Sequence, residues 1–119
     1  MRPKNYKGVR CIKQQLSKCS TTVKTYDKIQ TALADILEHD AAIESFSCNV
    51  LLEGLPEGEY TTDFLCKKTD GDYCVRECVF RSKLSLPRTC KLLDVSRQYW
   101  LKRGIHDWAI VVEMEADHE

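Results

Sequence analysis

The 119-residue sequence lacks several features that would exclude a compact cytosolic protein. No apolar run approaches the length of a membrane span, and no stretch near the start is typical of a signal peptide. There is no internal repeat, no low-complexity tract and no net charge, because 18 Lys and Arg balance 18 Asp and Glu. We therefore expect a soluble, cytoplasmic, single-domain protein that makes no contact with a membrane.

Histidine is also scarce, and the cysteines form no CxxC pair. The sequence has three histidines and seven cysteines, and the closest cysteines, Cys74 and Cys78, have CxxxC spacing. That spacing is not typical of a zinc or redox site. An odd number of cysteines at apolar, strand-like positions favours buried, reduced thiols, as in cytosolic proteins.

The charges that are present are distributed unevenly along the chain. Residues 1 to 28 contain eight Lys or Arg against the single acid Asp27, whereas the last seven residues contain four Asp or Glu and no Lys or Arg. We interpret residues 1 to 24 as a basic, flexible arm, with a short helical turn over residues 10 to 18. Such an arm would bind DNA phosphates or would simply be a solvated leader. The candidate DNA-binding residues are Lys4, Lys7, Arg10 and Lys13.

Hydrophobic periodicity predicts two helices. Apolar residues recur at helical spacing over residues 26 to 39, and Thr25 is the expected N-cap. A second helical pattern begins near Pro87, and Gly104 suits the position just after its end.

Four strands are expected around these helices. The order along the chain is helix, three meandering strands, helix and a last strand, which predicts an α/β fold with a mixed four-stranded sheet and one helix on each face. The last segment is a nearly continuous apolar run, typical of a strand covered on both faces. The expected strands are "IESFSCNVLLEG", residues 59 to 67, residues 73 to 81 and "DWAIVVEM".

Two acidic residues stand in the middle of the predicted central hairpin. Whether Asp63 and Glu77 share a face depends on the loop between their strands, because a shift of one residue reverses every side chain. A two-residue loop of Asp70 and Gly71 would place the two acids on opposite faces. A three-residue loop that begins at Thr69 would place them directly opposite each other.

The three-residue loop is favoured because it makes one face of the hairpin apolar. Under this register Lys68 pairs with Asp72, and Arg76 is the one misfit on the apolar face. The residues that share this face are Phe64, Cys66, Cys74, Cys78 and Phe80.

Two carboxylates that face each other on a sheet repel and need a counterion. A divalent cation, Mg²⁺ or Mn²⁺, would resolve the conflict and could activate a water for attack on a phosphodiester. The alternative is that one acid lies at the rim of the sheet or pairs with a nearby cation, either Lys67, Lys83 or Arg81.

The predicted order of elements is that of the PD-(D/E)XK nuclease core. "YTTDF" resembles the second-strand "PDF" of that superfamily, and "KLLDVSRQYWLKRGIHDWAIVVE" is similar to the helix and last strand of the TnsA family of transposon-end endonucleases. The resemblance spans about residues 26 to 113. It implies a restriction-endonuclease-like αβββαβ core, with residues 25–119 as the PD-(D/E)XK-like domain.

The resemblance also implies a set of site residues. Asp63 matches the metal-binding aspartate of the motif, and Glu77 falls at the acidic position of the next strand. Where the family has a glutamate on the first helix, this sequence has Gln30, and Asp27 one turn earlier could stand in for it.

The motif lysine has no counterpart at its expected position. Val79 stands two residues after Glu77, where the family has the lysine that stabilises the transition state or positions the attacking water. Arg81, on the same side of the strand, or Lys83 just beyond it, would have to replace that lysine.

Three functions are compatible with this set of residues. The first is a metal-dependent, TnsA-like DNA endonuclease of a mobile genetic element. The second is a catalytically inactive protein with the same fold, which binds DNA or docks on a transposase, on another protein or on a second copy of this chain. The third is an inhibitor protein that uses the fold only as an interaction surface.

Overall fold

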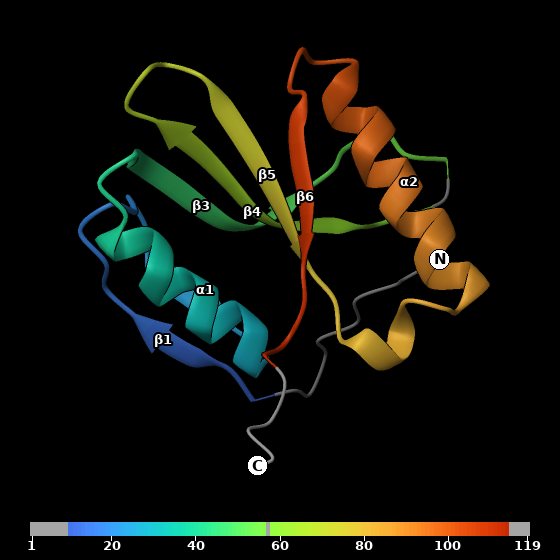
Figure 1. The fold of residues 1–119 in the computed structure, drawn as a ribbon, viewed down its shortest axis with the longest axis horizontal. Helices are drawn as coiled ribbons and strands as arrows, with labels where there is room; N and C mark the ends of the chain where they lie inside the picture. The colour runs from blue at the N-terminus through green and yellow to red at the C-terminus, as the bar shows by residue number, and fades with distance from the viewer. Residues whose placement is uncertain (1–9, 57, 115–119) are drawn as a thin grey trace.

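The structure is a computed structural model that describes residues 10–56 and 58–114. Its main sheet has four strands in the order β3-β4-β5-β6, and Figure 1 shows the helices α1 and α2 on opposite sides of it. Neither helix in this described part of the chain is long and apolar enough to cross a bilayer. The elements are β1 (Ile12–Gln14), β2 (Val23–Thr25), α1 (Lys28–His39), β3 (Ile43–Leu51), β4 (Thr61–Lys68), β5 (Tyr73–Cys78), the 3-10 helix η1 (Arg81–Lys83), α2 (Pro87–Leu101) and β6 (Asp107–Val111).

The α/β class and the αβββαβ order of the main elements are as the sequence predicts. Strand β4 is antiparallel to both β3 and β5, whereas β6 runs parallel to β5. The crossover from β5 to β6 passes through α2, as a parallel connection requires.

The hairpin of β4 and β5 has the three-residue loop. Lys67 pairs with Tyr73 and Cys66 with Cys74, and the backbone N–H of Lys68 donates to the carbonyl oxygen of Asp72 at 2.7 Å. Gly71 ends the loop with φ +95°, in the left-handed region where glycine has no Cβ to clash. The preferred register is therefore confirmed.

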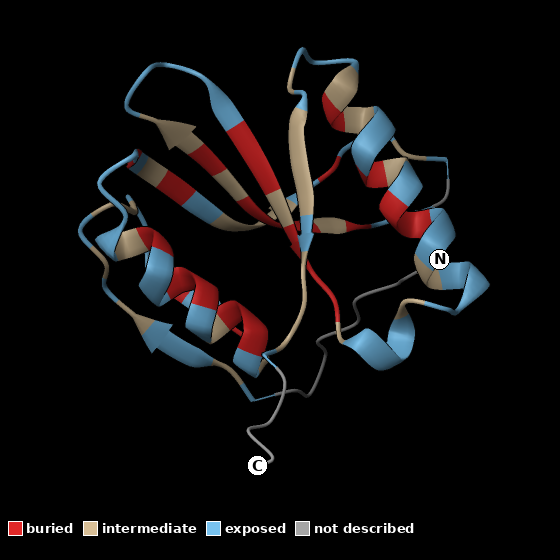
Figure 2. Cartoon of the chain, viewed as in Figure 1, coloured by how far each residue is buried: buried red, intermediate tan, exposed pale blue. Residues whose placement is uncertain are grey.

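Two apolar clusters fill the two faces of the sheet, and Figure 2 shows buried residues on the sides of both helices that face it. On the α1 side Leu33 and Leu37 pack with Phe64 and with the buried thiols of β4 and β5. On the α2 side Leu92 and Trp100 pack with Leu52, Tyr60 and Val75. Each helix therefore covers one face of the sheet.

Helix α1 begins two residues later than predicted. Asp27, not Thr25, is the N-cap, and its carboxylate accepts a hydrogen bond from the backbone N–H of Gln30 at 2.8 Å. Thr25 instead ends β2, where it is buried and its hydroxyl hydrogen-bonds that of Thr31 at 2.8 Å. Thr and Asp are both good N-cap residues. Thr25 is still part of β2, so Asp27, directly before α1, caps the helix.

The prediction of a helical turn over residues 10 to 18 is wrong. These residues belong to a small antiparallel hairpin in which Ile12 pairs with Thr25 and Gln14 with Val23. The loop of the hairpin is held by α1, because Glu38 accepts hydrogen bonds from the backbone N–H and the hydroxyl of Ser17. Of the predicted DNA-binding residues, Arg10 and Lys13 are exposed, whereas Lys4 and Lys7 lie outside the described residues.

Strand β6 is less covered than its apolar sequence predicts. It is an edge strand, and none of the residues in β6 is fully buried. Trp108 packs on the α2 side and Val111 on the α1 side, but Ile110 is 41% exposed. Strand β5 also ends earlier than predicted, at Cys78, because the chain turns into η1 after Phe80.

Candidate functional site

The two acids of the central hairpin lie where β4 and β5 begin to separate. The paired register of these strands runs to Phe64 and Arg76, and its continuation by one residue brings Asp63 opposite Glu77. Both acids are 0% exposed. At this point each carboxylate accepts a hydrogen bond from the backbone of the opposite strand. The Asp63 N–H donates to Glu77 Oε1 at 3.1 Å, and the Cys78 N–H donates to Asp63 Oδ2 at 2.6 Å.

The second oxygen of Asp63 is bound by helix α1. Gln30, which is also 0% exposed, donates from Nε2 to Asp63 Oδ1 at 2.5 Å. The same nitrogen donates to Asn49 Oδ1 at 2.9 Å, and Gln30 Oε1 accepts from the backbone N–H of Tyr26 at 3.0 Å. Gln30 therefore links the start of α1 to β3 and β4 and is held in one amide orientation.

The second oxygen of Glu77 is bound by helix α2. Ser96, at 0% exposure, donates from Oγ to Glu77 Oε2 at 2.5 Å. The Ser96 hydroxyl in turn accepts from the indole N–H of Trp108 at 3.0 Å. One turn further along α2, the indole N–H of Trp100 donates to Thr62 Oγ1 at 2.8 Å, so a second buried polar contact joins this helix to β4.

All four carboxylate oxygens of the acid pair therefore accept hydrogen bonds from protein donors. Hydrogen bonds to charged groups are among the strongest in proteins, and burial of a carboxylate is tolerated only with such partners. The donors come from both helices and from the backbone of the hairpin itself. The network thus ties the two faces of the sheet together at one point.

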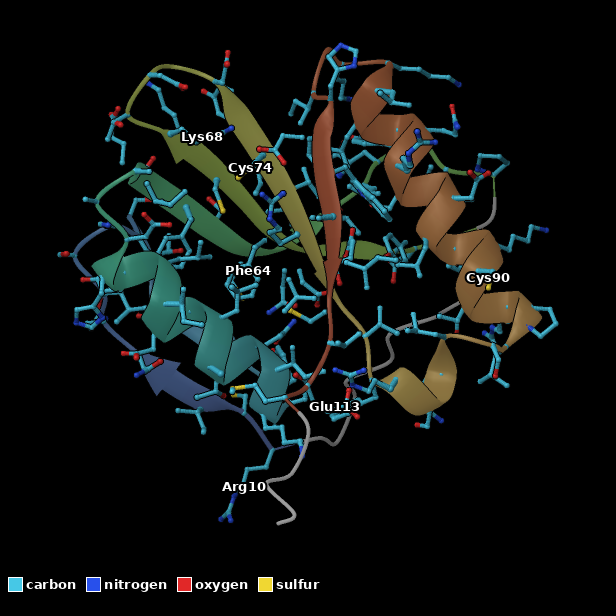
Figure 3. The ribbon with its side chains drawn as sticks, in the orientation of Figure 1. Arg10, Phe64, Lys68, Cys74, Cys90 and Glu113 are labelled. Carbon is cyan, nitrogen blue, oxygen red and sulfur yellow. The ribbon has the colours of Figure 1, made fainter. Side chains whose placement is uncertain are left out.

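Other predicted site residues bond elsewhere. Arg81 lies in η1, where its backbone N–H donates to Glu113 Oε1 at 2.8 Å and its Nε donates to the carbonyl oxygen of Glu113 at 3.3 Å. Figure 3 shows Glu113 just beyond the end of β6. The Asp27 carboxylate caps α1, and Lys67 lies 3.9 Å from Glu44. The structure therefore brings Asp63, Glu77 and Gln30 together but does not add Arg81 to them.

Val79 follows the acid pair in the place of the motif lysine. Its side chain is 7% exposed, and its backbone N–H donates to the carbonyl oxygen of Val111 on β6 at 2.9 Å. An apolar side chain at this position offers neither a charge nor a proton to a reacting group. Lys83, the other candidate replacement, is exposed in η1.

A Mg²⁺ or Mn²⁺ ion at this pair would compete with protein donors for the carboxylate oxygens. Mg²⁺ requires near-octahedral oxygen ligands at about 2.0–2.1 Å and usually retains several waters. Asp63 and Glu77 are fully buried, and each of their oxygens already accepts a protein hydrogen bond. Within residues 10–56 and 58–114, no group of three or more His, Cys, Asp or Glu side chains is placed to hold a metal ion.

Three residues of this network were not found from the sequence. Ser96 lies on the buried face of α2, four residues from Leu92 and from Trp100. A small polar residue on that face indicates a buried hydrogen-bond partner. Asn49 has φ +56°, a conformation that no sequence pattern here indicates. Trp108 packs on the α2 side of the sheet, and its indole N–H also supports Ser96.

Comparisons with known proteins add no identity to this geometry. No protein-family model matches the sequence, and no curated protein matches it. The likeness to the TnsA family therefore rests on the sequence motifs and on the order of the elements.

Proposed function

We propose that this chain is a non-cleaving, nuclease-like module that acts by binding DNA. The observation that carries the proposal is the bonding of the acid pair: Asp63 and Glu77 are fully buried, and every oxygen of the two carboxylates accepts a hydrogen bond from the protein. A site that cleaves phosphodiesters needs ligand atoms that can reach an ion and a substrate. These carboxylates instead hold β4, β5 and both helices together.

Two replaced positions support the loss of cleavage. Gln30 presents an amide N–H to Asp63, at the place where the TnsA-like pattern has a third carboxylate. Val79 replaces the lysine of that pattern. Removal of one preorganised electrostatic group from an active site typically costs about a hundredfold to a thousandfold in rate.

An acid-free basic segment supports DNA as the partner. Residues 81–91 contain no Asp or Glu, and their four cationic side chains are all exposed. They belong to η1 and to the first half of α2, and Figure 1 shows these two elements next to each other. Such a cluster can neutralise phosphates independently of sequence. The cations are Arg81, Lys83, Arg88 and Lys91.

The proposal is tested by measuring binding and cleavage on the same protein. Fluorescence anisotropy with duplex DNA in EDTA should show binding that weakens steeply with salt, because phosphate contacts release counterions. The variant Arg88→Glu/Lys91→Glu should lower the slope of log affinity against log salt by about 2 in magnitude. Lys102→Glu/Arg103→Glu, with the same change of charge at exposed positions outside this segment and outside residues 1 to 24, is the matched control and should change the slope less.

Cleavage is tested with supercoiled plasmid in Mg²⁺ or Mn²⁺. We expect no nicking above the level seen with Asp63→Ala. Nicking that depends on Asp63 would overturn the non-cleaving proposal. Binding without salt dependence, or co-purification with a protein in place of DNA binding, would favour a protein-interaction module such as a transposase partner or an inhibitor.

The adjacency of Asp63 and Glu77 favours a second candidate, the metal-dependent TnsA-like endonuclease. This candidate predicts that Mn²⁺ raises the thermal midpoint of the natural protein. At a Mn²⁺ concentration of a hundred times the Kd, the free energy of unfolding should rise by about 2.7 kcal/mol. We expect no such shift. In Gln30→Glu a third carboxylate stands beside Asp63, and there Mn²⁺ should stabilise, whereas Gln98→Glu on the exposed face of α2 should not respond.

A further inference from the structure

Two buried cysteines face each other across the central hairpin. Cys66 on β4 and Cys74 on β5 are direct partners in the antiparallel register, and their exposed fractions are 0% and 3%. Both are free thiols and belong to the apolar cluster beneath α1. This pair takes no part in the acid network on β4 and β5.

The backbone geometry of this pair is compatible with a disulfide. In an antiparallel ladder, hydrogen-bonded and non-hydrogen-bonded residue pairs alternate. Lys68 and Asp72 form a hydrogen-bonded pair, so Cys66 and Cys74, two residues further along each strand, form the next hydrogen-bonded pair. Residues in such a pair have Cα atoms about 5.5 Å apart. That separation lies within the range that a disulfide spans, although the Cβ atoms must move closer than in an unbridged pair.

Charged groups border the pair at one end of the hairpin. Lys68 Nζ lies 2.8 Å from Asp107 Oδ2, and Arg76 Nη1 lies 2.9 Å from Asp107 Oδ1. Asp107 is the register partner of Cys74 on β6, and Figure 3 shows Lys68 and Cys74 at the same end of the hairpin. The side chains of these ions are 25–41% exposed, so solvent reaches the border of the pair.

The same neighbours ease the loss of one proton from the pair. The Cys66 thiol, as a hydrogen-bond donor, lowers the pKa of the Cys74 thiol to about 7. The positive charges of Arg76 and Lys68 act in the same direction, whereas burial and the negative charge of Asp107 raise the pKa. The pKa of Cys66 is raised, because its proton is held in the hydrogen bond to Cys74 and because it is buried. A thiolate, once formed, is therefore on Cys74, the thiol nearer to solvent.

We propose that Cys66 and Cys74 are a reversible oxidation site at which hydroperoxides oxidise Cys74 and Cys66 resolves the product to a cross-strand disulfide. The pairing in register, the common burial and the bordering cations carry this assignment. Cys90 is exposed and donates to the carbonyl oxygen of Leu84, so it offers no comparable partner in the register of a strand.

The reaction balances with one molecule of hydrogen peroxide. The Cys74 thiolate attacks one peroxide oxygen, the O–O bond breaks, and the products are a sulfenic acid on Cys74 and hydroxide, which takes up a proton. The Cys66 sulfur then attacks the Cys74 sulfur, the S–O bond breaks, and the leaving hydroxide takes the Cys66 proton to form water. Two thiols lose two electrons in total, and the peroxide gains them.

The test treats the full, folded chain with hydrogen peroxide, alkylates the remaining thiols and maps tryptic peptides by mass spectrometry. Cys74 is the one cysteine of tryptic peptide 69–76, and Cys66 lies in peptide 29–67 together with Cys48. A Cys48→Ser background therefore assigns any link between these two peptides. We expect that link, with the loss of two hydrogen atoms, and its disappearance on treatment with dithiothreitol.

Variants separate the two chemical steps. In Cys66→Ser, whose hydroxyl can still donate to Cys74 but cannot resolve the product, the sulfenic acid on Cys74 should persist, and dimedone labelling of peptide 69–76 should rise several-fold over the natural protein. Cys78→Ala is the matched control, because Cys78 is also buried on β5 and on the same face, and there the link should still form. Cys66→Ala serves if Cys66→Ser does not fold. Full alkylation of Cys74 after peroxide, a sulfinic acid on Cys74 as the main product, or a disulfide to another cysteine would overturn the proposal.

Discussion

Removal of one hydroxyl, in Ser96→Ala, should destabilise the whole fold. Ser96 is 0% exposed and bridges two groups: it donates to Glu77 Oε2 and accepts from the indole N–H of Trp108. Alanine has nearly the same volume, so no large cavity is formed and the packing of α2 is retained. The effect is therefore expected to come almost entirely from the lost hydrogen bonds.

The magnitude follows from these two contacts. Loss of a hydrogen bond to a charged group costs about 1.5–3 kcal/mol, and a buried donor left unsatisfied costs about 1–3 kcal/mol. Trp108 is only half-buried, so its N–H can regain water and its cost lies at the lower end. Alanine is the better helix former by up to about 0.5 kcal/mol. The net loss in the free energy of unfolding should be about 2–4 kcal/mol.

Urea denaturation followed by circular dichroism measures this loss as a fall in the midpoint of about 1–2 M at unchanged slope. Ser85→Ala, at an exposed position just before α2, is the control and should change stability by less than about 0.5 kcal/mol. In a Trp108→Phe background the same Ser96→Ala change should cost less, since no indole N–H remains to be orphaned. A loss below about 1 kcal/mol in the natural background would refute our account of how Glu77 is kept buried.

Three further changes test other parts of the structure. Trp100→Phe should cost about 1–2 kcal/mol in thermal or urea unfolding, because it removes the indole N–H that binds the buried Thr62 hydroxyl; a neutral effect would mean that Thr62 finds another donor. Gly71→Ala should cost about 1–2 kcal/mol from the left-handed backbone alone, because a Cβ there meets nothing within 4 Å, and Gly71→Asn should cost less. Asp107→Asn should lower stability by less than about 1 kcal/mol at pH 7, since the pair with Lys68 is partly exposed. Hydrogen bonds from Lys68 and Arg76 hold the pKa of Asp107 below its usual range, so this stabilisation is present above about pH 4 and is lost as the pH falls through the folded pKa. The deficit of Asp107→Asn measured by urea unfolding should therefore shrink below about pH 4, and a deficit that does not change with pH would contradict the ion pair.

The order and the faces of the main sheet were predictable because hydrophobic pattern constrains register. Only the three-residue loop puts Phe64, Cys66 and Cys74 on one face, and these residues do form the core beneath α1. A slip of β5 by one residue would have moved Cys74 to the face opposite Phe64 and Cys66 and would have separated the two acids. The sequence therefore contained enough information to place Asp63 opposite Glu77.

The hairpin of β1 and β2 was not predictable in the same way. Each strand has three residues, and Ile12 is exposed, so no alternating apolar pattern marks β1. The hairpin is held by contacts with distant residues, such as the hydrogen bond from Asn49 Nδ2 to the carbonyl oxygen of Lys24 at 2.8 Å and the bonds of Ser17 to Glu38. Tertiary contacts of this kind leave no local signal in the sequence.

The partners of the acid pair were equally hidden, because they come from separate elements. Gln30 lies on α1 and Ser96 on α2, on opposite faces of the sheet. Sequence spacing shows that two acids meet, but it does not show which polar side chains the helices bring to them. The expectation of a cation considered only the repulsion between the two acids. It did not consider that Gln30 and Ser96 donate hydrogen bonds to them.

An amide in place of a third carboxylate near the pair explains how the two acids persist in the core. Two like charges at close range are unfavourable, and a third carboxylate would require an ion to hold all three. Gln30 instead turns an N–H toward Asp63, and Ser96 turns its hydroxyl toward Glu77, so dipoles from the protein stabilise both acids. Once each oxygen has such a donor, the acids stabilise the fold by joining both helices to the separating ends of β4 and β5. We therefore expect Mn²⁺ to bind to Gln30→Glu and not to the natural protein.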